Sequence, residues 1–440
     1  MATNPVTLQV GEKPPLAQHD SSILDLAFAM DVTGSMGSYI HAAQQSIRQI
    51  AEDIVSAEKS DIRLALVEYR DHPPQDRSFI TRTHDFTDSV KTMKTWLDAS
   101  SAAGGGDGPE AVADGLHDVL KLSWRPEATK ICVLIADAPP HGLTGRGDGF
   151  PDGCPIGLDP VVIINQMAEK NITVYSVGCE PAINYCRDFF MALAHITGGQ
   201  YVPLGNAKLL AKVIIGGAQE EITLQRLMEE VHEEVVTEMQ TRGGADALDE
   251  EELAVNVHQK LQSRGAKAKA LVRNEAKLEM ASDFAQTIAT KRTNMADWKK
   301  EWESAGKSQP QHRGVPMMAM AGGGGYGSRM RSAPMMKKKM GKKKASRKES
   351  AESEECEEEC EDDAVDCADF AFDCADGAPM RAMAAPPPPP GAARGRMMMD
   401  SAPPASFAES YSVVDADVDL TQARRMVKKS IALNRVNYTK

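Results

Sequence analysis

Oxygen-bearing side chains gather at three points in the first half of the chain, beside apolar runs and a glycine-rich segment. The set comprises Asp31, Thr33, Ser35, Asp107, Glu110 and Asp137. Carboxylates and hydroxyls without paired His or Cys are the ligands that hard divalent cations prefer. The sequence therefore predicts a Mg²⁺ site, with Mn²⁺ or Ca²⁺ as alternatives, rather than a Zn²⁺ site at these positions.

The elements that must position these residues alternate between apolar runs and helical patterns over residues 20–219. Six segments predict strands, at residues 23–31, 61–70, 78–86, 130–137, 171–179 and 200–204. Helical patterns lie between them at residues 39–57, 109–122 and 160–170. This alternation predicts an α/β fold with a doubly wound, mostly parallel six-stranded sheet. Ligands bind such sheets beyond the carboxyl ends of the strands, which is where Asp31 and Asp137 lie.

Several motifs resemble those of a known family. DVTGSM at residues 31–36 is similar to the metal-ion-dependent adhesion site (MIDAS) motif, Asp-x-Ser/Thr-x-Ser, of von Willebrand factor type A (vWA) domains. RDH at Arg70, GGGDGPEAV at Gly104 and IADAPPHG at Ile135 resemble the version of this domain attached to the atypical alpha-protein kinases. The resemblance spans about 200 residues and implies a Rossmann-like vWA fold.

The same resemblance implies a role for each oxygen ligand. Asp31, Thr33 and Ser35 would form the first metal loop, and Asp137 would belong to the third. Asp-x-Pro-Glu resembles a loop of integrin beta subunits in which the Glu reaches the central metal and the Asp lies at a neighbouring calcium site. Glu110 is therefore expected as the direct ligand and Asp107 as the auxiliary one. The alternative is a metal-free turn in which Ser35 caps the following helix.

A loop rich in Gly and Asp follows Asp137, and we interpret it as a surface loop that shapes the choice of partner. Its candidate contact residues are His141, Arg146 and Asp148. Arg146-Gly147-Asp148 spells the tripeptide that integrins read, which we interpret as a coincidence. For His141 the competing interpretation is a solvated loop residue without contact to a ligand.

The rest of the chain divides by composition. Residues 1–19 predict an N-terminal arm, and residues 220–303 predict helices that either form an antiparallel pair or short coiled coil or pack back on the first domain. Residues 304–416 are low in aromatics and rich in Gly, Pro, Lys and Glu, so we expect disorder there. Residues 417–440 predict a basic amphipathic helix suited to docking in a partner's acidic groove, with the chain's own acidic block or a membrane surface as alternatives.

Composition and charge limit the class of function. The 440 residues include 50 basic and 63 acidic side chains, and the net charge of -13 argues against a nucleic-acid coat. We therefore do not expect nucleic-acid binding, although residues 337–348 are strongly basic. No apolar run approaches the ~18 residues of a membrane span, and residues 1–15 do not resemble a secretory signal. The expected compartment is the cytoplasm, with the nucleus as the alternative.

These observations predict a non-enzymatic, Mg²⁺-dependent protein-binding module in an intracellular adaptor or scaffold. A protein ligand would offer an acidic residue to the metal, and Pro386–Pro390 would suit a proline-recognition partner. Two alternatives stay open. The chain could be a regulatory or binding subunit of an alpha-kinase-type signalling system, or a nucleic-acid or ribonucleoprotein assembly factor acting through its basic tail. Against catalysis, no nucleotide-binding loop is paired with a lysine.

Overall fold

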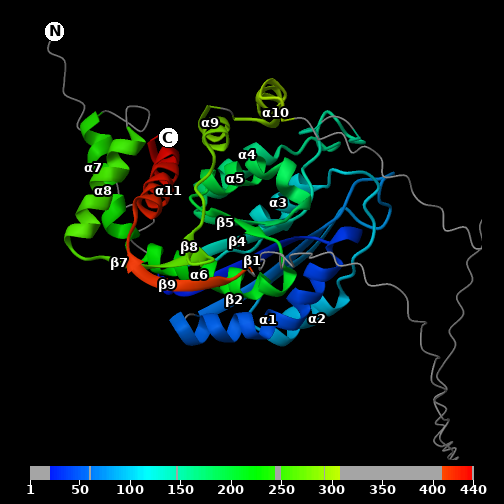
Figure 1. The fold of residues 1–440 in the computed structure, drawn as a ribbon, viewed down its shortest axis with the longest axis horizontal. Coiled ribbons are helices and arrows are strands. Elements are labelled where there is room, and N and C mark those ends of the chain that lie inside the picture. Colours follow the sequence, from blue (N-terminus) through cyan, green and yellow to red (C-terminus); the bar gives the residue numbers. More distant parts are fainter. Residues whose placement is uncertain are drawn as a thin grey trace, which may run out of the picture. The chain divides into compact units, whose positions relative to one another are not determined.

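The computed structural model describes six stretches of the chain, which all fall in one structural unit (Figure 1). They are residues 20–58, 61–144, 147–242, 249–291, 293–307 and 409–438. The predicted N-terminal arm, the basic run at residues 337–348 and the proline run Pro386–Pro390 lie outside the described residues, as does Arg146.

A six-stranded, mostly parallel sheet forms the centre of this unit. The strand order is β3-β2-β1-β4-β5-β6, and only β3 runs antiparallel to its neighbour. The strands are β1 (Asp20–Asp31), β2 (Asp61–Tyr69), β3 (Thr81–Thr87), β4 (Ala128–Ala136), β5 (Ile172–Cys179) and β6 (Gln200–Leu204). The doubly wound α/β fold predicted from the sequence is confirmed.

Alternating strand side chains divide the core into two layers, because successive residues of a strand point to opposite faces. In β1, Leu24 and Phe28 pack into one apolar cluster, whereas Ala27 and Ala29 belong to the other. The first cluster includes residues of α1 (Gly37–Glu58), α2 (Val90–Ala99) and α6 (Leu210–Gln225). The second includes residues of α3 (Val112–Lys121), α4 (Pro160–Glu169) and α5 (Arg187–Ile196). Figure 1 shows these two groups of helices on opposite faces of the sheet.

The segment after α6 contains strands as well as helices, and this part of the sequence prediction was wrong. The apolar residues Ala268 and Leu271, expected on a helix, lie in β7 (Lys267–Arg273). This strand is the centre of a three-stranded antiparallel sheet with β8 (Ala276–Lys277) and β9 (Tyr411–Asp417). Strand β9 also falls where the sequence predicted low complexity up to residue 416.

Three helices beyond the sheet share a third apolar core. They are α7 (Met228–Arg242), α8 (Glu250–Ser263) and α11 (Leu420–Tyr438), which follows β9. Val235, Leu261 and Val427 are among the side chains buried in this core. The helices α7 and α8 thus pack together with the C-terminal helix, and α11 presents its apolar face to this chain rather than to solvent.

Two further helices, α9 (Asp283–Lys291) and α10 (Met295–Ser304), pack back on the first domain. Trp298 and Trp302 are 0% and 1% exposed and belong to the same cluster as Phe189 of α5. The rings of Phe189 and Trp298 meet edge to face with their centroids 5.6 Å apart. The alternative of helices that pack back on the sheet domain therefore holds for this pair.

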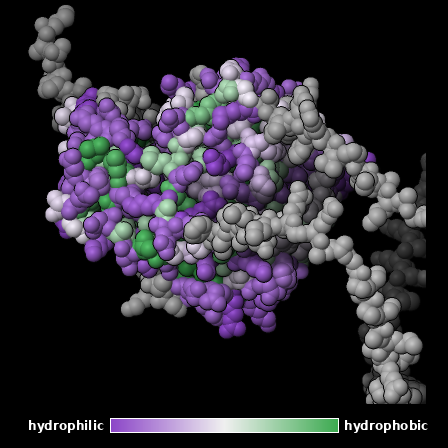
Figure 2. All heavy atoms as spheres, viewed as in Figure 1, coloured by the Kyte–Doolittle hydropathy of each residue, from purple (hydrophilic) through white to green (hydrophobic). Residues whose placement is uncertain are grey.

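Polar side chains cover most of the face drawn in Figure 2. Among the described residues, the exposed large apolar side chains are Ile156, Val162, Met280 and Val414. None of the helices in the described part of the chain combines the length and the hydropathy that a membrane span requires.

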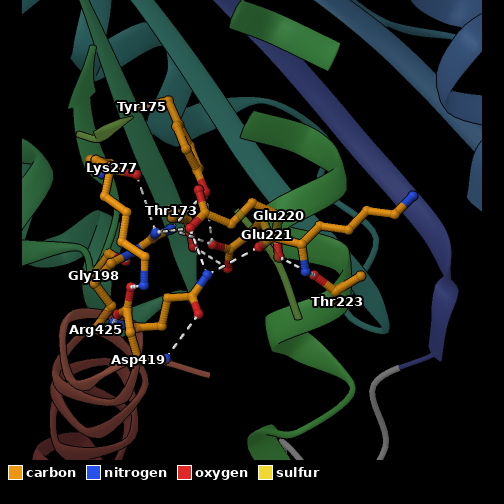
Figure 3. Close-up of polar contacts among 12 residues, drawn as sticks. Thr173, Tyr175, Gly198, Glu220, Glu221, Thr223, Lys277, Asp419 and Arg425 are labelled. Carbon is orange, nitrogen blue, oxygen red and sulfur yellow. Dashed lines mark hydrogen bonds and ion pairs between the residues drawn. The ribbon is translucent and has the colours of Figure 1, made fainter. Parts of the chain in front are cut away.

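A buried ion-pair network joins α11 to the sheet domain (Figure 3). Arg425 lies 2.9 Å from Glu220 Oε1 and 3.3 Å from Glu221 Oε2, and it donates a hydrogen bond of 2.6 Å to the Tyr175 hydroxyl. Lys429 pairs with Glu221 as a second cation. Two carboxylates of α6 are thereby balanced by two cations of α11. Burial raises the pKa of Glu221, but Lys429 and Arg425 outweigh this effect and hold that pKa below its usual value.

Close approach of α11 also depends on Gly198, whose φ is +69°. The Arg425 guanidinium donates to the Gly198 carbonyl at 2.9 Å. A Cβ at position 198 would lie 2.8 Å from the Arg425 carbonyl oxygen, so a larger residue would push the helix away.

Replacement of Arg425 by Met should lower the free energy of unfolding by about 3–5 kcal/mol, because it leaves the buried Glu220 and Glu221 with one cation between them. The neighbouring Arg424 provides the matched control. It pairs with the exposed Glu251, so Arg424→Met should cost about 1 kcal/mol or less. Urea unfolding of the two variants measures both effects, and equal losses would contradict the role assigned to the buried network.

Two histidines at the α11 interface should make stability sensitive to acid. Burial, together with the charge of Lys428, lowers the pKa of His195 to about 3, and burial lowers the pKa of His232 to about 4. A histidine with a depressed folded pKa contributes fully above its unfolded pKa of about 6.5, and this contribution is lost as the pH falls. As the pH falls from about 6.5 to 4.5, each of these two histidines should lower the free energy of unfolding by about 1 kcal/mol per pH unit.

The paired substitutions His195→Gln and His232→Gln should flatten the dependence of unfolding free energy on pH in this window. His41→Gln on the exposed side of α1 serves as the control and should leave the wild-type slope unchanged. Denaturation curves at a series of pH values give the slopes. A double variant with the wild-type slope would show that neither histidine is kept neutral by the fold.

Candidate metal centre

Three loops meet at the carboxyl edge of the sheet. Strand β1 ends at Asp31, β4 ends just before Asp137, and residues 104–110 lead into α3. Backbone hydrogen bonds join these loops: Gly34 N–H donates to the Gly104 carbonyl at 3.2 Å, and Glu110 N–H donates to the Pro139 carbonyl at 2.9 Å. Because β1 and β4 are adjacent parallel strands, their ends deliver both carboxylates to one place.

The first loop presents oxygen atoms toward one another. Asp31 Oδ1 accepts hydrogen bonds from the Thr33 amide at 2.8 Å and from the Thr33 hydroxyl at 2.6 Å. The hydroxyl oxygens of Thr33 and Ser35 lie 3.4 Å apart. Asp31 is fully buried, and its Oδ2 has no hydrogen-bond partner among the described residues.

The metal-free alternative, a helix cap, does not account for this loop. A short 3₁₀ helix spans Gly34–Met36, and its N-cap residue Thr33 makes no side-chain capping hydrogen bond. Ser35 lies inside that 3₁₀ turn, and its hydroxyl interacts with Asp137. The two hydroxyls are therefore turned toward the carboxylates rather than toward the amides of α1.

The second loop places its two carboxylates differently. Glu110 is 4% exposed, and its Oε2 has no partner among the described residues. Its other oxygen lies close to Gly105, where a Cβ would be 3.0 Å from Glu110 Oε1 and 3.3 Å from Thr33 Cβ. Asp107 instead accepts a hydrogen bond from the Gly149 amide. It lies beside Asp71 and His141, so Glu110 faces the first loop and Asp107 a neighbouring cluster.

Burial raises the pKa values of these carboxylates, and at Asp31 and Glu110 repulsion by neighbouring carboxylates adds to it. Burial and the charge of Asp137 raise the pKa of Asp31 to about 7. Burial and the charges of Asp31, Asp71, Asp107 and Asp137 raise that of Glu110 to about 11. Burial also raises the pKa of Asp137. Anions held together in this way favour a cation among them.

A buried carboxylate elsewhere in the sheet shows how the chain satisfies such a group when no metal is needed. Asp25, six residues before Asp31 in β1, is fully buried. Arg63 donates to its two oxygens at 2.9 and 2.7 Å, and Arg125 donates to both as well. Asp31 and Glu110 have no such arginine. The residues present thus fit a divalent cation, since two orphaned buried oxygens accompany an all-oxygen donor set.

The residues expected to contact a partner are placed differently from the sequence prediction. His141 and Asp148 are buried, and His141 Nδ1 lies 2.9 Å from Asp148 Oδ1. His141 Nε2 lies 2.7 Å from Asp71 Oδ1. Burial lowers the pKa of His141, but the hydrogen bonds to Asp148 and Asp71 outweigh it and raise that pKa to about 9. His141 is therefore neither solvated nor free for a ligand: it is a buried cation between two carboxylates.

The sequence prediction did not include Asp71, His72, Asp114 and Cys154, which lie beside the three loops. Asp71 follows β2 at the same edge of the sheet as Asp31 and Asp137. The reasoning that ligands bind beyond the carboxyl ends of parallel strands therefore also predicts Asp71. No such rule identifies Asp114 inside α3 or Cys154 in the loop before α4. Only the folded chain brings those two together.

Comparisons with known proteins agree with this architecture. The family model of the von Willebrand factor A domain matches residues 25–144. The alpha-protein kinase vwkA of Dictyostelium discoideum is 30% identical over 158 residues, which cover 35% of this chain and 25% of the kinase. A putative ariadne-like RING finger protein of Acanthamoeba polyphaga mimivirus is 29% identical over 211 residues, covering 44% of this chain and 20% of that protein.

The chain thus spans at most a quarter of the length of these two curated relatives. Among solved structures, the pilus adhesin SpaC from Lactobacillus rhamnosus GG aligns with 12% identity over 46% of this chain and 31% of its own, with a TM-score of 0.35. That likeness is too weak to support an argument. The family match and the six-stranded sheet together show that this chain contains a von Willebrand factor A domain.

Proposed function

We propose that this chain is a Mg²⁺-dependent protein-binding module in an adaptor protein. Asp31, Thr33, Ser35, Glu110 and Asp137 would hold the ion. The observation that carries the proposal is the convergence of Asp31, Glu110 and Asp137, where Asp31 Oδ2 and Glu110 Oε2 are among the buried oxygens without a partner in the described residues. Elsewhere in the same sheet a buried carboxylate has arginine partners, as at Asp25.

Within this proposal each residue has a distinct task. Thr33 orients Asp31 through two hydrogen bonds to one oxygen, which leaves the other oxygen for the ion. Asp137 interacts with Ser35 and so connects the ends of β1 and β4. Glu110 supplies the second-loop carboxylate, and Asp107 serves the neighbouring cluster. A bound Mg²⁺ would supply an open coordination position for a carboxylate of the partner.

A binding role without catalytic turnover agrees with the comparison with the two curated relatives. The relatives bear different names, a kinase and a RING finger protein, and each is matched over a quarter of its length or less. A domain that recurs in otherwise different chains is suited to recognition of a partner. We keep the cytoplasm as the expected compartment of this adaptor.

A second candidate, a binding subunit of an alpha-kinase-type signalling system, is favoured by the match to the Dictyostelium kinase. The two proposals share the same metal face and differ in what the partner does. Phosphotransfer by the purified protein alone would replace both with an enzymatic function.

Mg²⁺ should raise the melting temperature of the wild-type protein, because it relieves the repulsion among Asp31, Glu110 and Asp137. At a concentration of about 100 times the dissociation constant, the gain in unfolding free energy is about 2.7 kcal/mol. Asp31→Asn should differ from wild type both in its melting temperature without metal and in its response to Mg²⁺. The variant should melt at a higher temperature than wild type in EDTA, since one buried anion is removed, and it should not respond to Mg²⁺.

Differential scanning calorimetry of both proteins in EDTA and in Mg²⁺ checks this prediction. Asp98→Asn is the control, because Asp98 lies on the exposed side of α2 and pairs with Lys94. It should respond to Mg²⁺ like wild type. An unchanged Mg²⁺ response in Asp31→Asn would rule out the proposed ligand set.

Partner binding should depend on the same residue. Affinity purification with wild type in Mg²⁺ should retain proteins that are lost both in EDTA and with Asp31→Asn in Mg²⁺. Quantitative mass spectrometry of the three samples identifies them, and Asp98→Asn should match wild type. If Asp31→Asn retains the same proteins as wild type, the metal face is not the binding surface.

A further inference from the structure

A second cluster of potential metal ligands lies beside the oxygen-rich centre. His72 follows β2, Asp114 lies in the first turn of α3, and Cys154 lies in the loop between β4 and α4. One ligand atom of each lies within 4.8 Å of the other two. His72 and Asp114 are 2% and 4% exposed, and Cys154 is half-buried with a free thiol.

The three donor atoms are already spaced like ligands of one ion. His72 Nε2 lies 3.0 Å from Asp114 Oδ2, and Cys154 Sγ lies 3.6 Å from the first and 3.4 Å from the second. Zn²⁺ bonds of roughly 2.3 Å to sulfur and roughly 2.0–2.1 Å to nitrogen and oxygen, set at the tetrahedral angle, separate the donors by about 3.3–3.6 Å. The observed triangle agrees with these separations to within about 0.3 Å.

A Cys-His-Asp catalytic relay would require a different arrangement. In such a relay the nucleophile and the carboxylate contact opposite ring nitrogens of the histidine. Here both Cys154 and Asp114 approach the same nitrogen, Nε2. Burial and the charge of Asp114 also raise the pKa of the Cys154 thiol, which disfavours a reactive thiolate in the absence of a cation. Three donors that converge on one point instead suit a metal ion.

The surroundings complete such a site. The backbone amides of Leu158 and Ile156 interact with the Cys154 sulfur and favour its thiolate form. Asp114 and Cys154 also line a cavity of about 370 Å³, which leaves room for a solvent molecule as a fourth ligand. The Phe150 ring packs edge to face against His72, with centroids 5.6 Å apart, and shields the imidazole on one side.

The neighbouring cluster is less suited to bind a metal ion. It comprises Asp71, Asp107 and His141. Both ring nitrogens of His141 contact carboxylates, Nδ1 with Asp148 and Nε2 with Asp71. The imidazole therefore has no nitrogen left for a metal. His72 Nε2, by contrast, is shared only with the two other candidate ligands in the contacts described.

We infer that His72, Asp114 and Cys154 form a Zn²⁺ site, distinct from the Mg²⁺ site and with solvent as its fourth ligand. Thiolate and imidazole select Zn²⁺ over Mg²⁺, whereas the all-oxygen cluster selects the harder ion. The Zn²⁺ would fasten the loop that carries Cys154 to α3 and to the end of β2. This inference does not depend on the function proposed for the oxygen-rich centre.

Co²⁺ is the probe, because a thiolate ligand produces a charge-transfer band and a tetrahedral site produces intense visible absorption. The protein used is the full chain with Cys356, Cys360, Cys367 and Cys374 changed to Ser, since those thiols would also bind the probe. Excess Mg²⁺ is present throughout to compete with Co²⁺ for the oxygen-rich centre. We expect one Co²⁺ per chain, one thiolate band, and displacement of Co²⁺ by Zn²⁺.

Cys154→Ser should abolish the thiolate band, and His72→Gln should weaken Co²⁺ binding by about 100-fold or more, since loss of even an outer-shell partner costs about 10–100-fold. His117→Gln, on the partly exposed face of α3, is the matched control and should bind like the parent. Circular dichroism establishes that each variant is folded, and His72→Gln provides the test should Cys154→Ser fail to fold.

Three results would overturn the inference. They are the absence of a thiolate band in the parent protein, a band that survives in Cys154→Ser, and a band that is lost in Asp31→Asn. The last would mean that the two clusters act as one site. Retention of the band in Asp31→Asn together with loss of the Mg²⁺ response would instead separate the Zn²⁺ site from the proposed function.

Discussion

Repulsion between carboxylates at the carboxyl edge of the sheet is the constraint that the rest of the domain must accommodate. Parallel strands end at the same edge, so Asp31 and Asp137 are brought together by the fold itself, and the loops add Asp71, Asp107 and Glu110. The chain neutralises part of this charge internally, because His141 is held between Asp71 and Asp148. Asp31 and Glu110 are left with unpartnered oxygens, and these are the positions at which the proposed cation would bind.

A second set of buried charges holds the C-terminal helix α11 against the sheet domain. Glu220 and Glu221 lie in the last helix of the sheet domain, and both are buried against Arg425 and Lys429 of α11. An uncompensated pair of buried carboxylates would be costly, so α6 requires α11 in place. The pairing of β7 with β9 in register, from Lys267 opposite Asp417 to Arg273 opposite Tyr411, holds the same segment through backbone hydrogen bonds. The basic character of α11, which suggested an acidic partner, serves this chain instead.

The sequence predicted the six-stranded sheet well, because each strand can be recognised from a short run of neighbouring residues. Runs such as residues 130–137 are short, apolar and bounded by polar residues, and each predicted strand of the domain is present. Residues 267–273 could not be assigned in the same way, because Ala268 and Leu271 have the i, i+3 spacing of a helix, whereas Ala268, Ala270 and Val272 have the alternation of a strand. Their strand partner, β9, lies more than a hundred residues later, and no local pattern reports such a pairing. At the metal centre, the positions of Asp31 and Asp137 followed from the strand ends. The burial of His141 did not, because one of its two carboxylate partners, Asp71, lies 70 residues away in the chain.

One loop connects the proposed Zn²⁺ site to the neighbouring cluster of Asp71, Asp107 and His141, and a glycine in this loop allows the close approach. Asp148 binds His141, the Gly149 amide donates to Asp107, and Cys154 reaches His72 and Asp114. A Cβ at position 149 would lie 2.8 Å from Asp107 Oδ2, so only glycine lets the backbone approach that carboxylate. On the other side, the His72 amide donates to Asp71 Oδ1, which also contacts His141. The consecutive residues Asp71 and His72 serve different clusters, so Zn²⁺ on His72 would restrict the loop that also contacts Asp107. Because Asp107 and Glu110 lie in the same segment before α3, the surface around the oxygen-rich centre would then depend on the Zn²⁺ site as well.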